Sequence, residues 1–449
     1  MTKTEKRRNK AAVWTAALCA FALVVGLVAC SPSSSDETTE EGSEETEEST
    51  TEEADYETPE TDEYGVVLAE SWADLYPLQY ASYLENEENS PDSDKHDYLE
   101  LYPALNTMYA GYAFSLGYDE ASSHLYTLES VSSSPRTTEK EQLANCITCK
   151  TPQFTALVAS EGDSVYSEAF NDLIDDFTEP VSCYNCHEND VTTLTLTASY
   201  FEEALGDDAG EDSDVPMSAQ VCGQCHDEYY FDPDTKVTTN PYTGTDEMTP
   251  DSILAYYDEL GYSDWNHGTT YAPMIKVQHP EFETVYGGEG SYMANLGYSC
   301  ADCHMGTTTS DDGEEYTSHN WTSPLENEEL LENVCSECHD DLASEVEEIQ
   351  AEEEERVTEI SEKIEEFENL IAENYADEIA AMQEADENDE EVPEASDELA
   401  ELWEIQRDAQ FYWDFVMVEN SEGAHNPDLT TETLDKAEEL VDEGLAMFE

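Results

Sequence analysis

Basic residues are the scarcest feature of this sequence. Its 449 residues include 15 Lys and Arg against 109 Asp and Glu, which gives a formal net charge of −94. A surface of this sign repels nucleic acid and anionic lipid headgroups, so neither is an expected partner. The plain explanation for the acidity is a solvated surface adapted to high salt, or a lineage-wide bias. After residue 29 only ten basic residues remain, so few that the role of each is worth asking: Lys95, Arg136, Lys140, Lys150, Lys236, Lys276, Arg356, Lys363, Arg407 and Lys436.

No cysteine is left over for a disulfide. Of the 12 cysteines, Cys19 lies in the N-terminal apolar run, Cys30 follows that run, and the other ten form five CxxC units. A disulfide framework is therefore not expected, although an exported protein could form one. Four units end in histidine, and CxxCH is the attachment site of a c-type haem, with two thioether bonds and an axial histidine. The predicted haem-binding residues are Cys183, Cys186, His187, Cys222, Cys225, His226, Cys300, Cys303, His304, Cys335, Cys338 and His339.

The first CxxC unit differs from the other four. Cys146 and Cys149 are followed by Lys150 in place of histidine. An ammonium group cannot ligate iron, so Lys150 would have to lose its proton through burial and through the charge of the metal. A haem with two histidine ligands suits electron transfer, whereas a haem that binds substrate needs an open position. We therefore predict that Lys150 marks the active site; the alternative is a zinc-binding CxxC followed by an unrelated lysine.

The N-terminus has the features of an export signal. A basic start precedes an apolar run from Ala11 to Ala29, which ends in Leu-Val-Ala-Cys30 and resembles a bacterial lipobox. Residues 1–29 are predicted to be a lipoprotein signal peptide and Cys30 the lipidated residue, with a plain transmembrane anchor as the alternative. Either would hold the exported chain at the outer face of the cytoplasmic membrane. Residues 30–63 are too polar to bury a core, which predicts a disordered acidic linker.

Strand patterns are rare in the remainder, which favours a mainly α fold. The CxxC units begin 37, 39, 78 and 35 residues apart, so they do not form a solenoid repeat. For residues 64–340 we expect one integrated domain of short helices and loops around five haems, which would serve as apolar filler.

The pattern changes over residues 341–449. From Leu342 to Ile371 apolar residues recur at spacings of three and four, with Glu353 in one slot, which predicts a long amphipathic helix. Further helices are expected over about 398–418 and 431–448. These helices could pack within the chain or form a dimer seam, and the sequence does not distinguish the two.

Two stretches outside the haem motifs complete a resemblance to a known family. They are Cys222-Gly-Gln-Cys-His-Asp-Glu-Tyr-Tyr-Phe231 and Pro273-Met-Ile-Lys-Val-Gln-His-Pro-Glu281. With one CxxCK followed by four CxxCH motifs, roughly residues 100–450 resemble the ammonia-forming pentahaem cytochrome c nitrite reductases. The resemblance implies a multihaem cytochrome c fold with long C-terminal helices. It also implies six-electron reduction of nitrite to ammonium at a lysine-ligated haem that four other haems supply with electrons.

The resemblance also implies three catalytic residues. In that family a tyrosine, a histidine and an arginine surround the open side of the lysine-ligated haem, and they match Tyr229, His279 and Arg136. An arginine and a histidinium can hold the nitrite anion and stabilise developing charge, while a tyrosine and a histidine can donate protons. In so acidic a chain, positive potential at Arg136, His279 and Lys276 is needed to admit an anion. The alternatives are that Arg136 is a surface residue and His279 a haem ligand.

Calcium is a further expectation from the resemblance. Members of the family that contain calcium bind it beside the active haem through a glutamate side chain, a glutamine side chain and two backbone carbonyls. The matching residues are Glu228 and Gln278 for the side chains, and Tyr229 and Lys276 for the carbonyls. Ligation by oxygen alone suits this ion.

Distal haem ligands follow from the same resemblance. His319 would serve the second haem, His124 the third and His425 the fourth. His96 lies in a polar stretch and is predicted to be solvated.

The fifth haem departs from the family pattern. Its distal ligand is usually a histidine seven residues before the fourth of the five haem motifs, which begins at Cys300, and Met293 stands there instead. Methionine is a good haem ligand that raises the potential relative to a second histidine. We predict ligation by His339 and Met293, with His267 as the alternative.

Two other functions would fit the same motifs. A pentahaem electron carrier with no substrate is one alternative, and a reductase of hydroxylamine, nitric oxide or sulfite is another. The resemblance further implies a membrane-bound quinol dehydrogenase or other multihaem protein as electron donor, and a homodimer formed through the C-terminal helices.

Overall fold

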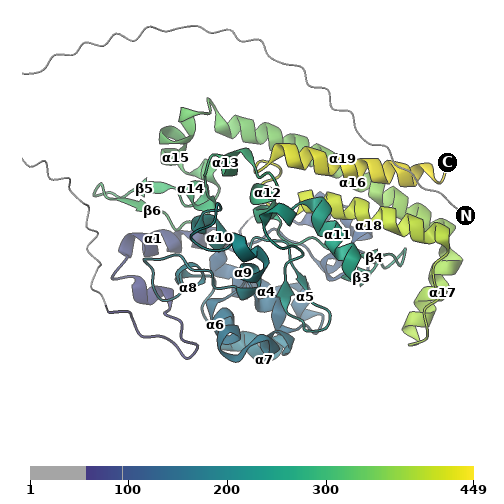
Figure 1. Cartoon of the computed structure of the whole chain (residues 1–449), viewed down its shortest axis with the longest axis horizontal. Helices are drawn as coiled ribbons and strands as arrows, with labels where there is room; N and C mark the ends of the chain where they lie inside the picture. The colour runs from purple at the N-terminus through teal and green to yellow at the C-terminus, as the bar shows by residue number, and fades with distance from the viewer. Residues whose placement is uncertain (1–56, 94) are drawn as a thin grey trace, which may run out of the picture. The chain divides into compact units, whose positions relative to one another are not determined.

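The computed structural model describes residues 57–449 except Asp94, and these residues form one compact unit (Figure 1). The predicted signal peptide, the lipidation site at Cys30 and residues 30–56 of the predicted linker lie outside the described part.

Most regular structure before residue 341 consists of short helices, as predicted. Their lengths fit a chain that turns repeatedly around its cysteine motifs. They are α1 (Pro77–Glu85), α2 (Tyr98–Leu101), α3 (Leu105–Met108), α4 (Thr127–Ser133), α5 (Pro135–Thr138), α6 (Pro152–Glu161), α7 (Phe170–Leu173), α8 (Cys183–His187), α9 (Ser199–Leu205), α10 (Met217–Gly223), α11 (Pro250–Leu260), α12 (Glu281–Tyr286), α13 (Tyr292–Asn295), α14 (Cys300–His304) and α15 (Glu328–Asn333).

The described strands form three separate two-stranded antiparallel ribbons. In register, Tyr230 lies opposite Thr239, Trp265 opposite Met274, and Thr308 opposite Tyr316. The strands are β1 (Tyr230–Phe231) with β2 (Thr238–Thr239), β3 (Trp265–Asn266) with β4 (Pro273–Met274), and β5 (Thr307–Thr309) with β6 (Glu315–Thr317).

Two of the CxxCH motifs are themselves one-turn helices that begin at a capping serine. In α14, Ser299 Oγ accepts from the Asp302 amide, and Asp302 Oδ2 accepts from the Ser299 amide at 2.7 Å. In α8, Asn185 Oδ1 accepts from the Ser182 amide at 3.0 Å. This reciprocal capping starts a helix at the residue before the first cysteine. Both thiols and the histidine of each motif, at positions i, i+3 and i+4, therefore lie on one face of the helix.

Long helices dominate the C-terminal region, and α16, α18 and α19 pack side by side (Figure 1). The three predicted helices are confirmed as α16 (Leu342–Asn374), α18 (Asp397–Met417) and α19 (Pro427–Ala446). The last begins four residues earlier than predicted, because Asn426 caps it and Pro427 occupies its first turn. One helix was missed, α17 (Ala376–Glu387), which follows a break at Tyr375.

The apolar face of α16 is covered by the chain's own helices. Val357, Ile360, Ile364 and Phe367 are at most 1% exposed and belong to one core with residues of α18 and α19. Of the two arrangements that the sequence left open for these helices, this face packs within the chain. A face already packed within one chain has no apolar area left to bury against a partner.

Ion pairs tie the C-terminal helices to each other and to the rest of the chain. Arg356 and Lys363 on α16 pair with acidic residues of α19, at 2.8 Å for both Arg356–Asp435 and Lys363–Glu438. Lys436 pairs with Asp251 on α11. These contacts use three of the ten basic residues and hold the helical region against the cysteine-motif region.

Candidate haem sites and active site

The cysteine motifs lie close to one another in a defined order. Cys149 of the first motif contacts Cys225 of the third, and Cys222 of the third contacts Cys300 of the fourth. None of the described cysteines forms a disulfide. The thiols are thus free for thioether bonds, and the first, third and fourth motifs form a continuous series.

Two predicted axial histidines face the histidines of the motifs they were expected to serve. The ring centroids of His124 and His226 are 5.9 Å apart, and those of His304 and His425 are 6.0 Å apart. Imidazoles on opposite sides of one iron, at roughly 2 Å per bond, place their centroids about 6 Å apart. The spacing of both pairs therefore fits a haem iron between them.

The Nδ1 atom of five predicted axial histidines already contacts an oxygen. Such a contact fixes the ring and leaves Nε2 for a metal, as metal-ligating histidines require. The partners are Thr193 O for His187 (2.7 Å), Thr322 O for His304 (2.9 Å), Thr317 O for His319 (3.1 Å), Glu345 Oε2 for His339 (2.7 Å) and Glu419 Oε1 for His425 (2.6 Å).

These oxygen partners are the functional residues that the sequence analysis missed. A signal for them existed, since four of the five lie two to six residues from their histidine in the chain. Burial lowers the pKa of His425, but the Glu419 carboxylate outweighs it and raises the pKa to about 9.

His267 is placed differently from these histidines. Its Nε2 contacts the Thr107 carbonyl at 2.7 Å, and its Nδ1 contacts Thr270 Oγ1 at 2.9 Å. Both ring nitrogens are thus occupied by protein, and the side chain is fully buried. Burial lowers its pKa to about 4, so the ring is neutral. His267 has the environment of a core histidine, whereas the exposed His96 is solvated as predicted.

Tyr229 and His279 lie close to the first motif. Tyr229 immediately precedes β1, and its hydroxyl interacts electrostatically with the thiols of Cys149 and Cys146. His279 stands between β4 and α12 and interacts with the Lys150 ammonium. Burial lowers the pKa of His279 to about 4 and raises that of Tyr229 well above its ordinary value.

His279 differs from the axial histidines in one respect that bears on its role. Its Nδ1 atom is buried and has no hydrogen-bond partner among the described residues. Unpaired buried polar atoms are rare in native structures and call for a ligand, ion or water.

Arg136 reaches the same region from α5. Ser134 Oγ caps this helix by accepting from the Arg136 amide, and the guanidinium lies 4.2 Å from the centre of the Phe114 ring. Its charge acts on Cys146 and on Tyr112. The structure therefore brings Arg136, Tyr229 and His279 together around the CxxCK motif.

Lys276 is a second cation near Arg136. It is held by Asp414, a residue that the sequence analysis missed. Its Nζ lies 3.1 Å from Asp414 Oδ2 on α18 and 5.3 Å from the centre of the Phe114 ring, which Arg136 also contacts. Tyr109 donates a hydrogen bond to the same carboxylate. Burial lowers the pKa of Lys276, and Asp414 opposes that shift. Nothing near Asp414 in the sequence indicated this contact.

The residues predicted to bind calcium are close together. Glu228 Oε2 accepts a hydrogen bond from the backbone N–H of Gln278 at 2.6 Å. The side-chain Nε2 of Gln278 donates to the backbone carbonyl of Lys276 at 3.0 Å. Burial raises the pKa of Glu228 well above its ordinary value, as it does for neighbouring Asp227. Asp227 Oδ1 and Glu283 Oε2 are buried and have no hydrogen-bond partner among the described residues. Buried acids in this number fit a nearby cation.

Acidic side chains alone do not define a metal site here. The described residues contain no group of three or more His, Cys, Asp or Glu arranged to hold an ion. That finding agrees with the predicted calcium ligands, because only one of the four, Glu228, contributes a carboxylate. The other donors are an amide and two backbone carbonyls.

The comparison with known families covers almost the whole described chain. A sequence model of the cytochrome c552 family matches residues 69–447. The chain belongs to this family. Its described part is mainly helical, and the protein carries covalently bound c-type haems.

Individual relatives agree with this assignment. The cytochrome c nitrite reductase subunit NrfA of Nitratidesulfovibrio vulgaris is 32% identical over 410 residues, which cover 81% of this chain and 75% of that protein. Cytochrome c-552 of Aliarcobacter butzleri is 31% identical over 388 residues, covering 82% and 73%. Among solved structures, cytochrome c nitrite reductase from Desulfovibrio desulfuricans matches with a TM-score of 0.71 at 26% identity, covering 85% and 86%. That structure is described as having two calcium sites in its catalytic subunit NrfA.

Within the part of the chain that the structure describes, every helix is too short or too polar to cross a bilayer.

Proposed function

We propose that this cytochrome is an oxidoreductase that reduces nitrite to ammonium at a haem attached to Cys146 and Cys149 and ligated by Lys150. One observation carries the proposal: Arg136, Tyr229 and His279 gather around the only motif that lacks an axial histidine. The likeness to nitrite reductases supports the same reaction. The haem would supply the electrons and an open iron position for the substrate.

Each of the three residues has a task that its chemistry allows. The Arg136 guanidinium would bind the nitrite oxygens and neutralise negative charge, with Lys276 adding potential from behind Phe114. Tyr229 is protonated at neutral pH, as its ordinary pKa already requires and as the upward shift of that pKa on burial reinforces, so it can donate a hydrogen bond. His279 is neutral because burial lowers its pKa to about 4, and it would become a proton donor when a bound anion raises the proton affinity of its ring.

Four further haems would carry electrons to this site, five in all. Their axial pairs are His187 with His319, His226 with His124, His304 with His425, and His339 with Met293. Contacts between the cysteines of neighbouring motifs support a continuous path. Met293 on α13 is retained over His267 because both ring nitrogens of His267 are occupied.

Calcium would occupy the site of Glu228, Gln278, Tyr229 O and Lys276 O. His279 directly follows Gln278 in the chain, and Tyr229 directly follows Glu228. An ion at this position would therefore fix the backbone that carries two of the catalytic side chains, besides neutralising buried acids.

The location and partners are proposed on less specific grounds. The apolar run and Cys30 support an exported, lipid-anchored protein at the outer face of the cytoplasmic membrane. A membrane-bound quinol dehydrogenase or another multihaem protein would supply electrons. A homodimer would have to use surfaces other than the buried face of α16.

The decisive experiment measures ammonium formed per nitrite consumed by purified holoprotein with a chemically reduced viologen. We expect a yield near one to one. Lys150→Leu should abolish it while spectra show the other haems intact, and Lys140→Leu, a change at another basic residue, should leave it unchanged. Nitrite left untouched by fully haem-loaded, reducible wild-type protein would favour an electron carrier and refute the proposal. Equal rates with hydroxylamine or sulfite would broaden the substrate range.

A further inference from the structure

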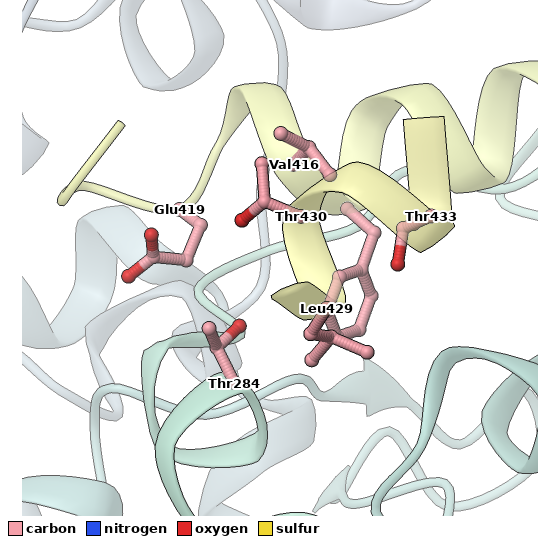
Figure 2. A pocket seen from close by; sticks show the side chains of 7 residues that line it. Thr284, Val416, Glu419, Leu429, Thr430 and Thr433 are labelled. Carbon is pink, nitrogen blue, oxygen red and sulfur yellow. The ribbon is translucent and has the colours of Figure 1, made fainter. Parts of the chain in front are cut away.

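Glu419 occupies an enclosed position just beyond the end of α18, beside the start of α19 (Figure 2). Only 3% of its surface is exposed. Oε1 accepts from His425 Nδ1 at 2.6 Å, and Oε2 accepts from Ser421 Oγ at 2.5 Å. A small cavity lined by Thr284, Val416, Leu429, Thr430, Thr433 and Glu419 itself lies against this carboxylate. Both oxygens are thus held in fixed positions by protein groups.

Among the histidines predicted to ligate haems, His425 has a distinctive partner. His187, His304 and His319 contact neutral backbone carbonyls. His339 contacts a carboxylate, but the Glu345 side chain is 49% exposed, against 3% for Glu419. Glu281 is buried, yet its oxygen is 3.8 Å from His226 Nδ1, beyond hydrogen-bond distance.

We propose that Glu419 lowers the reduction potential of the fourth haem by accepting a charge-assisted hydrogen bond from its distal ligand, His425. This inference rests on the proposed ligation of that haem by His304 and His425. Glu419 would touch neither substrate nor haem, and so acts as a positioning residue.

The physical basis is the charge on the acceptor. A carboxylate that accepts from Nδ1 draws the proton away from the ring, which makes Nε2 a stronger donor to the metal. A more basic ligand favours ferric over ferrous iron, so the potential falls. In a buried site this influence is weakly screened, whereas water around Glu345 reduces the same effect.

The arrangement has a consequence along the haem series. The fourth motif lies next to the third through Cys300 and Cys222, and it interacts with the fifth through Cys303 and Cys335. Methionine ligation would raise the potential of the fifth haem. Lowering the fourth potential separates it from that of the fifth. Haems of different potential then stand beside each other, and the difference is set by a residue of the C-terminal helical region.

The test compares reduction potentials of full-length holoprotein variants by spectroelectrochemical titration, with electron paramagnetic resonance to check spin state. Glu419→Gln keeps the shape and a hydrogen-bond acceptor but removes the charge. We expect one haem to shift to higher potential while all low-spin signals are retained. Glu345→Gln is the matched control, because it removes the same charge at a similar distance in an exposed setting. It should give a clearly smaller shift, on a different haem.

A second variant, Ser421→Ala, should shift the reduction potential of the fourth haem in the opposite direction. Ser421→Ala removes the hydroxyl that donates to Glu419 Oε2, which leaves more negative charge on the carboxylate. The potential of the same haem should then fall. This measurement stands by itself if Glu419→Gln does not yield folded holoprotein.

The outcomes separate this inference from the proposed ligation. If His425→Ala fails to convert one low-spin haem to high spin, His425 is not a ligand and the proposed ligand set is wrong. If that conversion occurs but Glu419→Gln and Ser421→Ala both leave every potential unchanged, the role of Glu419 is overturned and the ligation stands.

Discussion

The imidazole rings of His124 and His226 face each other at 5.9 Å, although two complete CxxC motifs lie between them in the sequence. His124 precedes the first motif in the chain and His226 belongs to the third. Trp321 packs edge-on against His124 at 4.8 Å from a third part of the chain. Three distant segments therefore build one candidate axial pair, and burial lowers the pKa of His124 to about 3.

Replacing His124 should convert one low-spin haem to high spin. His124→Ala removes the ring whose centroid lies 5.9 Å from that of His226, so the iron would lose its sixth ligand. Electron paramagnetic resonance of the oxidised protein would show the new high-spin signal. His96→Ala is the control, because His96 is exposed and should leave the spectrum unchanged. Identical spectra for the two variants would contradict the pairing.

A charge on the apolar face of α16 should unfold the helical region instead of separating subunits. Ile364 is 0% exposed, so Ile364→Glu would bury an unpaired carboxylate and lose apolar packing, at a cost of about 3–5 kcal/mol. Thermal denaturation should show a lower Tm, while Glu362→Gln on the exposed side of the same helix should have almost no effect. A folded, monomeric Ile364→Glu protein with wild-type Tm would show that this face does form a seam between subunits.

Removal of calcium should reduce nitrite turnover. Glu228→Gln removes the only carboxylate among the four proposed ligands, which should lower the affinity of the site for calcium, a hard cation. We expect metal analysis to show less calcium and activity to fall at least about tenfold, since misplacement of catalytic groups by about 1 Å costs more than that. The exposed Glu289→Gln change is the control. Full activity in a variant that has lost its calcium would rule out a positioning role for the ion.

Stability should depend on pH through Glu368. This residue is fully buried against Gln406 and lies 3.8 Å from His267, and burial raises its pKa to about 8. Because the folded-state pKa exceeds the unfolded value near 4.5, the folded protein binds more protons between about pH 4.5 and 8. Stability contributed by this group is therefore present at low pH and lost as pH rises through 8.

The matching measurement is Tm for Glu368→Gln and wild type at two pH values. At pH 8 the variant should be more stable by at least about 1 kcal/mol, because it avoids ionising a buried acid. At pH 4, below the unfolded pKa, the difference should nearly vanish. An equal difference at both pH values would mean that the change acts through packing and not through the proton.

Met293 can be tested by optical spectroscopy. Ligation by methionine sulfur gives oxidised haem a charge-transfer band at the red end of the visible range, which ligation by two histidines lacks. We expect this band in the wild type. Met293→His should remove it and lower the potential of one haem, because a second imidazole replaces the thioether. Absence of the band from wild-type protein would exclude Met293 as a ligand.

Several features were predictable from sequence because they are encoded locally. Haem attachment depends on five contiguous residues, so the motifs at Cys146 and Cys183 could be read directly. The helix from Leu342 was equally clear, because its apolar spacing repeats over many turns. By contrast, α17 was missed because only Ile379, Met382 and Ala385 on it are buried, too few for a visible period among acidic neighbours.

The site itself was predictable only in part. The sequence by itself determined the haem chemistry, the exceptional lysine and the extent of the long helices, because each is a property of neighbouring residues. Tertiary structure alone decided that α16 is buried by its own chain and that Lys276 is held by Asp414. Burial and charge pairing arise from contacts between segments that the chain brings together only on folding, and linear spacing carries no record of them.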